Sequence, residues 1–197
     1  TAYEIGVRLV GSEMCIRDRK YILRMKDLDL LKFVSPQLID TSVLKNIPAV
    51  LSESISLPEE PEIWYVYFLS LLYSMNEESF EQTAERLQIQ ARLRKKLIRD
   101  RETCKESLKL LGSNKVWSPE TIYNQLSGLS VEAIIYFLAA ASADRANQYV
   151  DTYFTEYYKQ KELFLTGDDL MGMGIKPGPV LQSVFKALRE ARVKGVI

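Results

Sequence analysis

The feature of this sequence that most constrains its fold is the stretch 165–195, where a loop rich in glycine and proline opens into an amphipathic segment. Glycine supplies backbone freedom and proline fixes φ, so 176–179 predicts a rigid turn that leads into a helix. Apolar residues then recur at helical spacing, cationic residues lie on the other side, and Gly195 is the expected C-cap. The apolar positions are Val180, Leu181, Val184, Phe185, Leu188 and Ala191, and the cationic positions are Lys186, Arg189, Arg192 and Lys194.

The start of this predicted helix is suited to binding an anion. A helix N-terminus has unpaired N–H groups and partial positive charge, and a glycine turn lets a phosphate approach the backbone closely. Proline has no N–H group, so the expected donors are the N–H groups of Gly178, Val180, Leu181 and Gln182. A tight loop before a core helix would give the same pattern, and spacing alone leaves both interpretations open.

The tail carries a longer pattern that resembles a known family. It reads G-D-D-L-x-x-x-G-I-x-P-G-P from Gly167 to Pro179, and a helix that ends A-R-x-x-G at 191–195 follows. This pattern is similar to the C-terminal signature of bacterial tRNA nucleotidyltransferases, in the branch of CCA-adding and A-adding enzymes related to poly(A) polymerases. The resemblance implies an enzyme with a catalytic head, a neck, and an all-helical body and tail that hold the tRNA.

The first nineteen residues are expected to lie outside the fold. The segment 1–19, TAYEIGVRLVGSEMCIRDR, resembles the translation of a sequencing adapter followed by a transposase end sequence. Gly6 and Val7 fall where the variable index of such an adapter would lie. The alternative is a genuine amphipathic N-terminal strand. Under the adapter interpretation, this segment belongs to no domain.

The remaining composition restricts the possible chemistry. Without the segment 1–19, Cys104 is the only cysteine, and the chain has no histidine. An intrachain disulfide and a cysteine metal site are then excluded, and Cys104 is expected to fill a small apolar space rather than to act as a nucleophile. No apolar run is long enough to span a membrane. These properties predict a cytoplasmic protein in a reducing setting that binds no membrane.

Apolar and amphipathic segments separated by proline and glycine predict an all-α fold of about nine helices, without strands. The run 62–75, EIWYVYFLSLLYSM, is apolar on all sides and predicts a buried core helix, although its aromatic residues would also suit base stacking. Turns are expected over 167–178. The expected helices are 20–33, 41–55 with an interruption at Pro48, 62–75, 76–88, 90–111, 119–126, 131–143, 144–161 and the tail helix after Pro179.

Asp27 and Asp29 form a D-x-D pair, the pattern with which nucleotidyltransferases bind two magnesium ions. Residues two apart on a helix point to different sides, so these carboxylates could not share metal ions there. As strand residues they would need a third catalytic carboxylate nearby. We therefore interpret both aspartates as part of a solvated helix face.

The segment 86–109 is strongly basic in a chain that has 26 basic and 26 acidic residues in total. Only Asp100, Glu102 and Glu106 oppose its cations, so it predicts a local positive field that would attract RNA. A solvated helix face is the alternative, because Lys and Arg are good helix formers. The basic residues of this segment are Arg86, Arg92, Arg94, Lys95, Lys96, Arg99, Arg101, Lys105 and Lys109.

Together with the resemblance, these patterns divide the chain into a helical neck-end and body over 20–161, which binds RNA, and a loop with a tail helix over 162–197. The expected partner is tRNA, contacted along the backbone of its acceptor stem and elbow through phosphate positions and shape. The residues predicted to bind RNA are Arg92, Arg94, Lys95, Arg99, Lys176, Gly178, Lys186, Arg189 and Arg192.

The catalytic features of the family do not follow residue 19. The resemblance implies a glycine-serine loop with a D-x-D pair in the head, where Mg²⁺ and CTP or ATP bind, and we assign no catalytic or metal-binding residue to this chain. The sequence therefore predicts the tRNA-binding C-terminal portion of an enzyme that adds CCA, CC or A to the tRNA 3′ end, inactive without its head. Two alternatives stay open: a non-enzymatic module like helix-hairpin-helix proteins, because 173–178 resembles their hairpin, and a helical protein-interaction domain.

Overall fold

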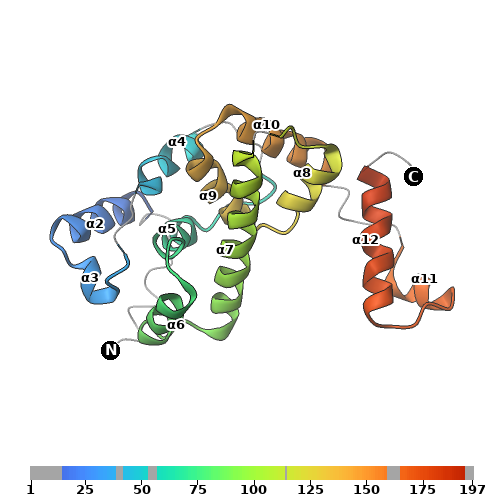
Figure 1. The fold of residues 1–197 in the computed structure, drawn as a ribbon, viewed down its shortest axis with the longest axis horizontal. Helices are drawn as coiled ribbons and strands as arrows, with labels where there is room; N and C mark the ends of the chain where they lie inside the picture. The colour runs from blue at the N-terminus through green and yellow to red at the C-terminus, as the bar shows by residue number, and fades with distance from the viewer. Residues whose placement is uncertain (1–14, 39–41, 53–56, 114, 159–164, 194–197) are drawn as a thin grey trace.

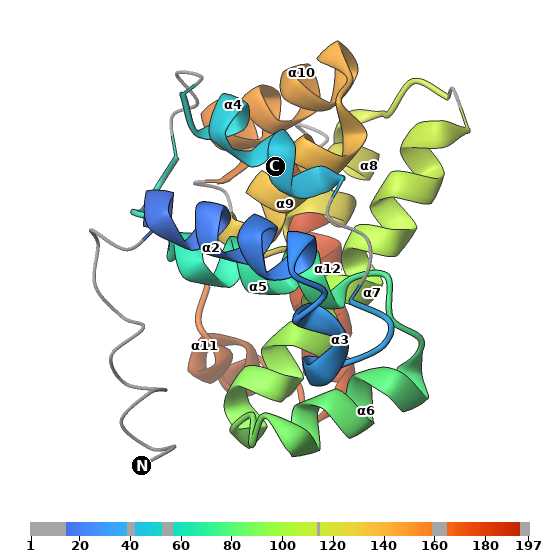
Figure 2. The same cartoon turned by 90° about the vertical axis from the view of Figure 1, so that its left-hand side faces the viewer.

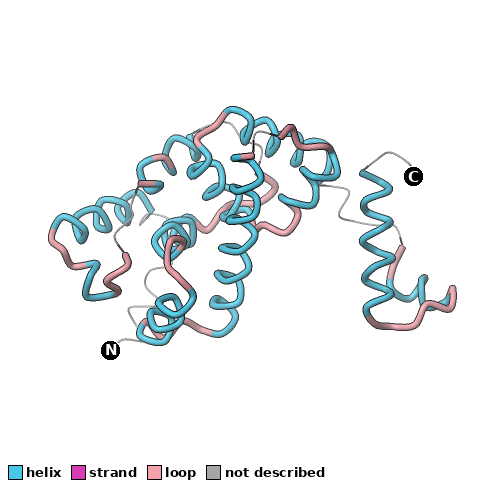
Figure 3. Tube along the Cα trace, in the orientation of Figure 1, coloured by secondary structure: helices cyan, strands magenta, loops and turns pink. Residues whose placement is uncertain are grey.

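A computed structural model describes residues 15–38, 42–52, 57–113, 115–158 and 165–193 of the chain. These residues form eleven α-helices and no strand, which confirms the all-α prediction (Figure 3). In chain order the elements are α2 (Cys15–Asp27), α3 (Leu31–Val34), the 3₁₀ turn η1 (Val43–Lys45), α4 (Ile47–Ser52), α5 (Ile63–Leu72), α6 (Glu77–Arg86), α7 (Ala91–Gly112), α8 (Pro119–Leu126), α9 (Val131–Ala141), α10 (Asp144–Thr152), the π-helical turn η2 (Tyr153–Tyr157), α11 (Gly167–Gly172) and α12 (Pro179–Val193).

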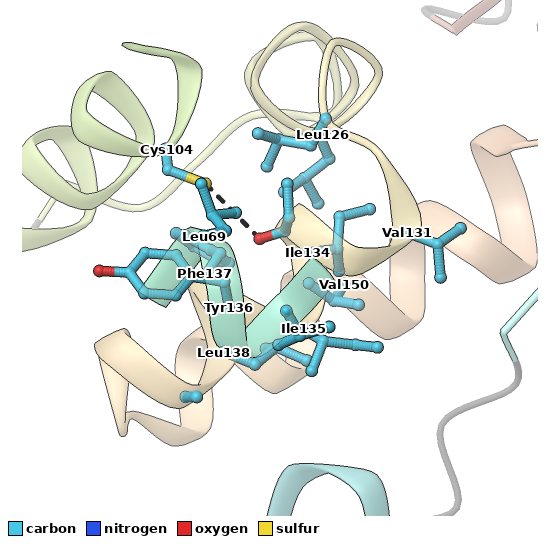
Figure 4. Close-up of a cluster of buried hydrophobic side chains, with 14 of the residues drawn as sticks. Leu69, Cys104, Leu126, Val131, Ile134, Ile135, Tyr136, Phe137, Leu138 and Val150 are labelled. Atoms are coloured by element: carbon cyan, nitrogen blue, oxygen red, sulfur yellow. Dashed lines mark hydrogen bonds between the residues drawn. The ribbon is translucent and has the colours of Figure 1, made fainter. Parts of the chain in front are cut away.

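Helix α9 is the centre of the core. Every residue over 131–139 is buried, as expected for a helix that is apolar on all sides. The helix packs against α4, α5, α7 and α10, and Figure 4 shows its side chains beside Leu69 of α5 and Val150 of α10. Cys104 of α7 is also buried here, and its thiol donates a weak hydrogen bond to the carbonyl oxygen of Ala133 at 3.5 Å. Its predicted role as a small apolar filler is confirmed.

The apolar run that predicted a core helix forms α5. Tyr65, Val66 and Leu69 are fully buried, which confirms the packing interpretation over the base-stacking one. The interruption expected at Pro48 is also present, because η1 ends before Pro48 and α4 contains it in its first turn. Proline is tolerated in the first turn of a helix, where its missing N–H group would have no partner.

Side-chain caps fix the starts of α6, α8 and α9. The side-chain oxygens of Asn76, Ser118 and Ser130 each accept a hydrogen bond from the backbone N–H three residues later. Such caps satisfy donors that a helix start leaves unpaired. These boundaries are local sequence signals, so the predicted helix starts at 119 and 131 agree with the structure.

The single helix predicted over 20–33 is wrong, because the chain breaks between α2 and α3. Asp29 adopts a left-handed conformation, with φ of 59°, and its carboxylate accepts a hydrogen bond from Lys32 at 3.0 Å. Aspartate enters this region more readily than most residues, and the bond to Lys32 supports the turn. Asp27 ends α2, and both aspartates are exposed, but Asp29 does not lie on a helix face.

The turns predicted over 167–178 are wrong in their first half, where α11 forms instead. Thr166 and Asp169 build a capping box, in which the Thr166 side chain accepts from the Asp169 N–H and the Asp169 carboxylate accepts from the Thr166 N–H. Two satisfied donors stabilise this short helix despite its glycine ends. The turn itself occupies 173–178 and contains Gly174, with φ of 89°.

The tail stands apart from the body in Figure 1, and only its upper end approaches the body. There, α12 contacts α8, and Val193 is buried. The first turns of α7 and α12 both lie toward the lower end of the molecule in Figures 1 and 2.

The predicted boundary at 161–162 and the C-cap at Gly195 lie outside the described residues. Helix α2 includes 15–19, and the adapter origin of 1–19 stays a prediction.

We expect Ser130→Ala to lower the free energy of unfolding by about 2 kcal/mol, from the lost α9 cap and the lost bond to a buried carboxylate. The Ser130 hydroxyl accepts from the Ala133 N–H at 3.2 Å and donates to Asp100 at 2.8 Å. Ser118→Ala is the matched control, because it removes a cap and an exposed bond to the Thr121 hydroxyl but no bond to a buried charge, and it should cost about 1 kcal/mol. Urea unfolding followed by circular dichroism measures both. Equal losses would show that the bond to Asp100 adds nothing.

Candidate nucleic-acid interface

Most cations of α7 fall into two sets, and the first set faces solvent without a partner among the described residues. Arg92, Lys95 and Lys109 are exposed, and none of them makes a hydrogen bond or ion pair with any described residue. Arg92 and Lys95 are three residues apart and share one side of the helix. They lie near the N-terminus of α7, where the helix dipole adds positive potential. This side of α7 therefore presents two cations that no described residue neutralises.

The second set of α7 cations is used inside the protein. Arg94 forms an ion pair with Glu81 of α6, and Lys96 binds the Glu132 carboxylate at 2.9 Å. Arg101 is buried, donates to the carbonyl oxygen of Met75, and lies 4.4 Å from the ring centre of Phe80. These side chains hold α7 against its neighbours, so their charge is already balanced or buried.

Arg99 is exposed like the first set and paired like the second. Its guanidinium donates to the Asp100 carboxylate through Nε at 3.3 Å and Nη2 at 3.2 Å. Its side chain is nevertheless 59% exposed, while that of Asp100 is fully buried. Asp100 also accepts hydrogen bonds from the Tyr65 hydroxyl at 2.9 Å and the Ser130 hydroxyl at 2.8 Å. The carboxylate thus joins α5, α7 and the start of α9.

Burial and nearby charges shift the pKa values of two groups near this carboxylate. Burial, with the charge of Asp100, raises the pKa of Tyr65, so the phenol remains a donor at neutral pH. Burial alone would raise the pKa of Glu132, but the hydrogen bond and charge of Lys96 outweigh it and lower that pKa. Glu132 is therefore ionised at neutral pH, and Lys96 is its counter-ion.

The turn before α12 offers backbone N–H groups as hydrogen-bond donors. Lys176 is exposed, and Gly178 has φ of 143°, a conformation that favours glycine. The Gln182 N–H donates to the Gly178 carbonyl at 3.4 Å, so the prediction that this group is available is wrong. The N–H groups of Gly178, Val180 and Leu181 have no acceptor among the described residues. Three of the four predicted donors thus remain open to an anion.

The cations of α12 differ in exposure. Lys186 is exposed, whereas Arg189 and Arg192 are partly buried. The Arg189 guanidinium lies 5.9 Å from the ring centre of Phe185, and its charge opposes the burial that raises the pKa of Tyr123 in α8. Arg189 therefore lies where α12 meets the body. The structure does not gather all the predicted cations in one place, since one group lies on α7 and the other on the tail.

The buried role of Asp100 was missed at the level of sequence, where it counted only as an opposing charge. A signal was present, because Asp100 lies three residues after Leu97 and four before Cys104, on the apolar stripe of the helix. A charged residue on such a stripe is buried and must be hydrogen-bonded. Its partners come from other helices and could not be read from spacing.

Two further properties concern the described residues as a set. None of their helices is long and apolar enough to cross a membrane. Among them, no group of three or more acidic, cysteine or histidine side chains is arranged to hold a metal ion.

Comparison with known proteins gives one relative in sequence, although no protein-family model matches the chain. The chain is 33% identical over 204 residues to the A-adding tRNA nucleotidyltransferase of Geobacter sulfurreducens. This match covers 96% of the chain but only 23% of that protein. The chain therefore spans about a quarter of the length of its curated relative.

Solved structures show the same fold at lower identity. The Thermotoga maritima CCA-adding enzyme complexed with tRNA is 20% identical, with a TM-score of 0.62, over 90% of this chain and 43% of that one. A CCA-adding enzyme in complex with ATP is 18% identical, with a TM-score of 0.63, over 98% of this chain and 49% of that one. At this identity, these likenesses concern the fold.

The pair of Lys96 and Glu132 makes stability depend on pH. A carboxylate whose pKa is lowered by folding stabilises the fold above its unfolded pKa, and this contribution is lost as pH falls through the folded pKa. Lys96→Met leaves Glu132 buried without its counter-ion, so we expect a loss of about 2 kcal/mol at neutral pH. The loss should shrink as the pH falls through the lowered pKa of Glu132, because protonation removes the charge that Lys96 balances.

Urea unfolding of both proteins across this pH range measures the difference. Lys95→Met is the matched control, because Lys95 is exposed and has no partner in the described part of the chain. It should change stability by no more than about 0.5 kcal/mol at any pH. A Lys96→Met loss that stays constant with pH would contradict the assignment to Glu132.

Proposed function

We propose that this chain is the tRNA-binding C-terminal portion of a tRNA nucleotidyltransferase, an enzyme that adds CCA, CC or A to the tRNA 3′ end. In this proposal, 20–161 form the end of the neck and the body, 162–197 form the tail, and 1–19 are adapter-derived. The sequence relative supports the proposal, because 96% of the chain matches an A-adding enzyme. An enzyme that acts on tRNA in this way is expected in the cytoplasm.

One observation carries the RNA-binding role: Arg92 and Lys95 are exposed side by side on α7 without a partner among the described residues. A folded protein that holds Arg94, Lys96 and Arg101 in internal contacts leaves these two for another molecule. Phosphates of an RNA duplex are the matching anions, and recognition through phosphates and shape suits a protein that must accept many tRNA sequences. In the solved relative from Thermotoga maritima, the bound partner is tRNA.

The tail supplies the second contact in this proposal. Lys176 and the open N–H groups of Gly178, Val180 and Leu181 form one anion-binding turn at the start of α12. Lys186 is exposed farther along the same helix. We propose that α7 contacts the acceptor stem backbone and the tail contacts the elbow. Two separated contacts would position the 3′ end relative to the active site.

The catalytic chemistry belongs to the absent head in this proposal. The intact enzyme would use Mg²⁺ with CTP or ATP, and the metal would supply charge stabilisation for nucleotidyl transfer. The carboxylates of the described residues form no group that could hold a metal ion. Asp169 is engaged with Thr166, and its pKa is lowered by those hydrogen bonds, while Asp100 is fully buried. The residues of this chain would bind and orient tRNA only.

We expect the chain to bind tRNA with a salt-dependent affinity, and the double variant Arg92→Gln/Lys95→Gln to bind more weakly. Losing two phosphate contacts should lower the slope of log affinity against log salt by about 1 to 2. Fluorescence anisotropy with labelled tRNA at several salt concentrations measures both quantities. Lys109→Gln is the matched control, since it removes an equally exposed charge at the other end of α7. An unchanged slope in the double variant would refute the assignment.

Duplex DNA of equal length distinguishes the proposal from a helix-hairpin-helix module, which the open N–H groups at the tail turn would also suit. Such a module binds duplex DNA phosphates, so equal affinity for DNA and tRNA would favour it. A protein-interaction domain would show no salt-dependent binding to either. Preference for tRNA supports the tRNA-binding portion.

The chain alone should add no nucleotide. Incubation with Mg²⁺, ATP and a tRNA that lacks its terminal adenosine should yield no extended product on a denaturing gel, because the described carboxylates form no metal site for nucleotidyl transfer. The Geobacter sulfurreducens enzyme serves as the positive control. Any extended tRNA from a preparation free of other enzymes would show that this portion contains a catalytic site.

A further inference from the structure

Arg99 is bound to the body by one edge of its guanidinium, and its other edge is open. Nε and Nη2 both donate to Oδ1 of Asp100, at 3.3 and 3.2 Å. No described residue accepts from Nη1. The side chain remains 59% exposed. Arg99 lies four residues after Lys95 and seven after Arg92, so all three cations are on one side of α7.

The carboxylate that holds Arg99 is itself fixed. Asp100 is fully buried, and its Oδ2 accepts from Tyr65 of α5 at 2.9 Å and from Ser130 at the start of α9 at 2.8 Å. Three helices therefore determine where Oδ1 lies. A guanidinium that binds this oxygen through two nitrogens has a fixed plane as well as a fixed position.

This arrangement has two opposite effects on phosphate binding. The negative charge of Asp100 weakens the attraction between Arg99 and a phosphate. The two hydrogen bonds also hold a flexible side chain in one geometry, so less conformational entropy is lost when it binds. Tyr65 and Ser130 share the carboxylate charge through hydrogen bonds on its inner oxygen, and Arg92 and Lys95 keep their full charge on the same side of the helix. The entropic effect should then outweigh the electrostatic one.

We propose that Asp100 is a positioning residue for RNA binding, which orients the guanidinium of Arg99 so that its open edge meets an RNA phosphate beside Arg92 and Lys95. This inference rests on the proposed function, because the phosphate is taken to belong to tRNA. It assigns a binding role to a buried acidic residue, which simple charge complementarity would count against RNA binding.

Asp100→Asn tests the inference, because positioning and electrostatics predict opposite changes in tRNA affinity. The substitution makes the chain more positive by one charge, so electrostatics alone predicts tighter tRNA binding. The neutral amide either turns its NH₂ group toward Arg99, which ends the contact, or keeps a weaker hydrogen bond. Positioning therefore predicts that tRNA affinity falls about threefold to tenfold in anisotropy titrations. Equal or tighter binding would overturn the inference.

Two further variants separate positioning from a structural effect. In an Arg99→Gln background, Asp100→Asn should no longer weaken tRNA binding, because the positioned group is absent. Tyr65→Phe is the matched control, since it removes a donor on the inner side of Asp100 and should lower stability without changing tRNA affinity. If Asp100→Asn weakens binding equally with and without Arg99, or if Tyr65→Phe weakens it as much, Asp100 has only a structural role.

If Asp100→Asn does not fold, Arg99→Lys still tests the inference. This variant should fold, because the Arg99 side chain is largely exposed. Lysine retains the charge but cannot bind Asp100 through two nitrogens and present a second edge, so affinity should fall by a similar factor. Unchanged affinity would again overturn the inference. A wild-type chain that binds no tRNA would contradict the proposed function as well, whereas normal binding that is insensitive to these variants contradicts the inference alone.

Discussion

The buried carboxylate of Asp100 is the interaction on which the arrangement of the body depends. A charge removed from water is costly unless hydrogen bonds and an opposite charge compensate it. Tyr65, Ser130 and Arg99 supply this compensation from α5, from the start of α9 and from α7. These hydrogen bonds link the three helices at one buried point.

The rotation of α7 that buries Asp100 also determines its outer surface. Leu97 and Cys104 share the buried side with Asp100, so helical periodicity places Arg92, Lys95 and Arg99 on the opposite, exposed side. Lys96 lies at the edge between these sides and reaches Glu132, whose other oxygen accepts from the Glu62 N–H before α5. Two acidic residues inside the fold thus fix which cations of α7 remain available to an anion.

Local signals in the sequence predict much of this fold. They fail where a single turn determines whether a helix continues or ends. Ser118, Ser130 and the apolar run of α5 gave correct helices because caps and apolar periodicity act within a few residues. The left-handed turn at Asp29 carries no strong sequence signal, whereas the Thr166 and Asp169 capping box of α11 was readable and was overlooked. For the site, spacing identifies the cations on α7. It cannot show that Arg94 and Lys96 are paired, because Glu81 and Glu132 belong to other helices.

Helix α8 connects the two elements proposed to bind RNA, because it contacts both α7 and α12. On one side, the Ser107 hydroxyl of α7 donates to the Gln125 side chain of α8 at 3.0 Å. On the other side, the charge of Arg189 in α12 acts on the buried phenol of Tyr123 in α8. A rigid ligand that contacts α7 and the tail turn together must match a spacing that these contacts hold. The partly buried Arg189 lies at this contact between the tail and the body, so in the proposed function it would hold the tail in place rather than touch phosphate.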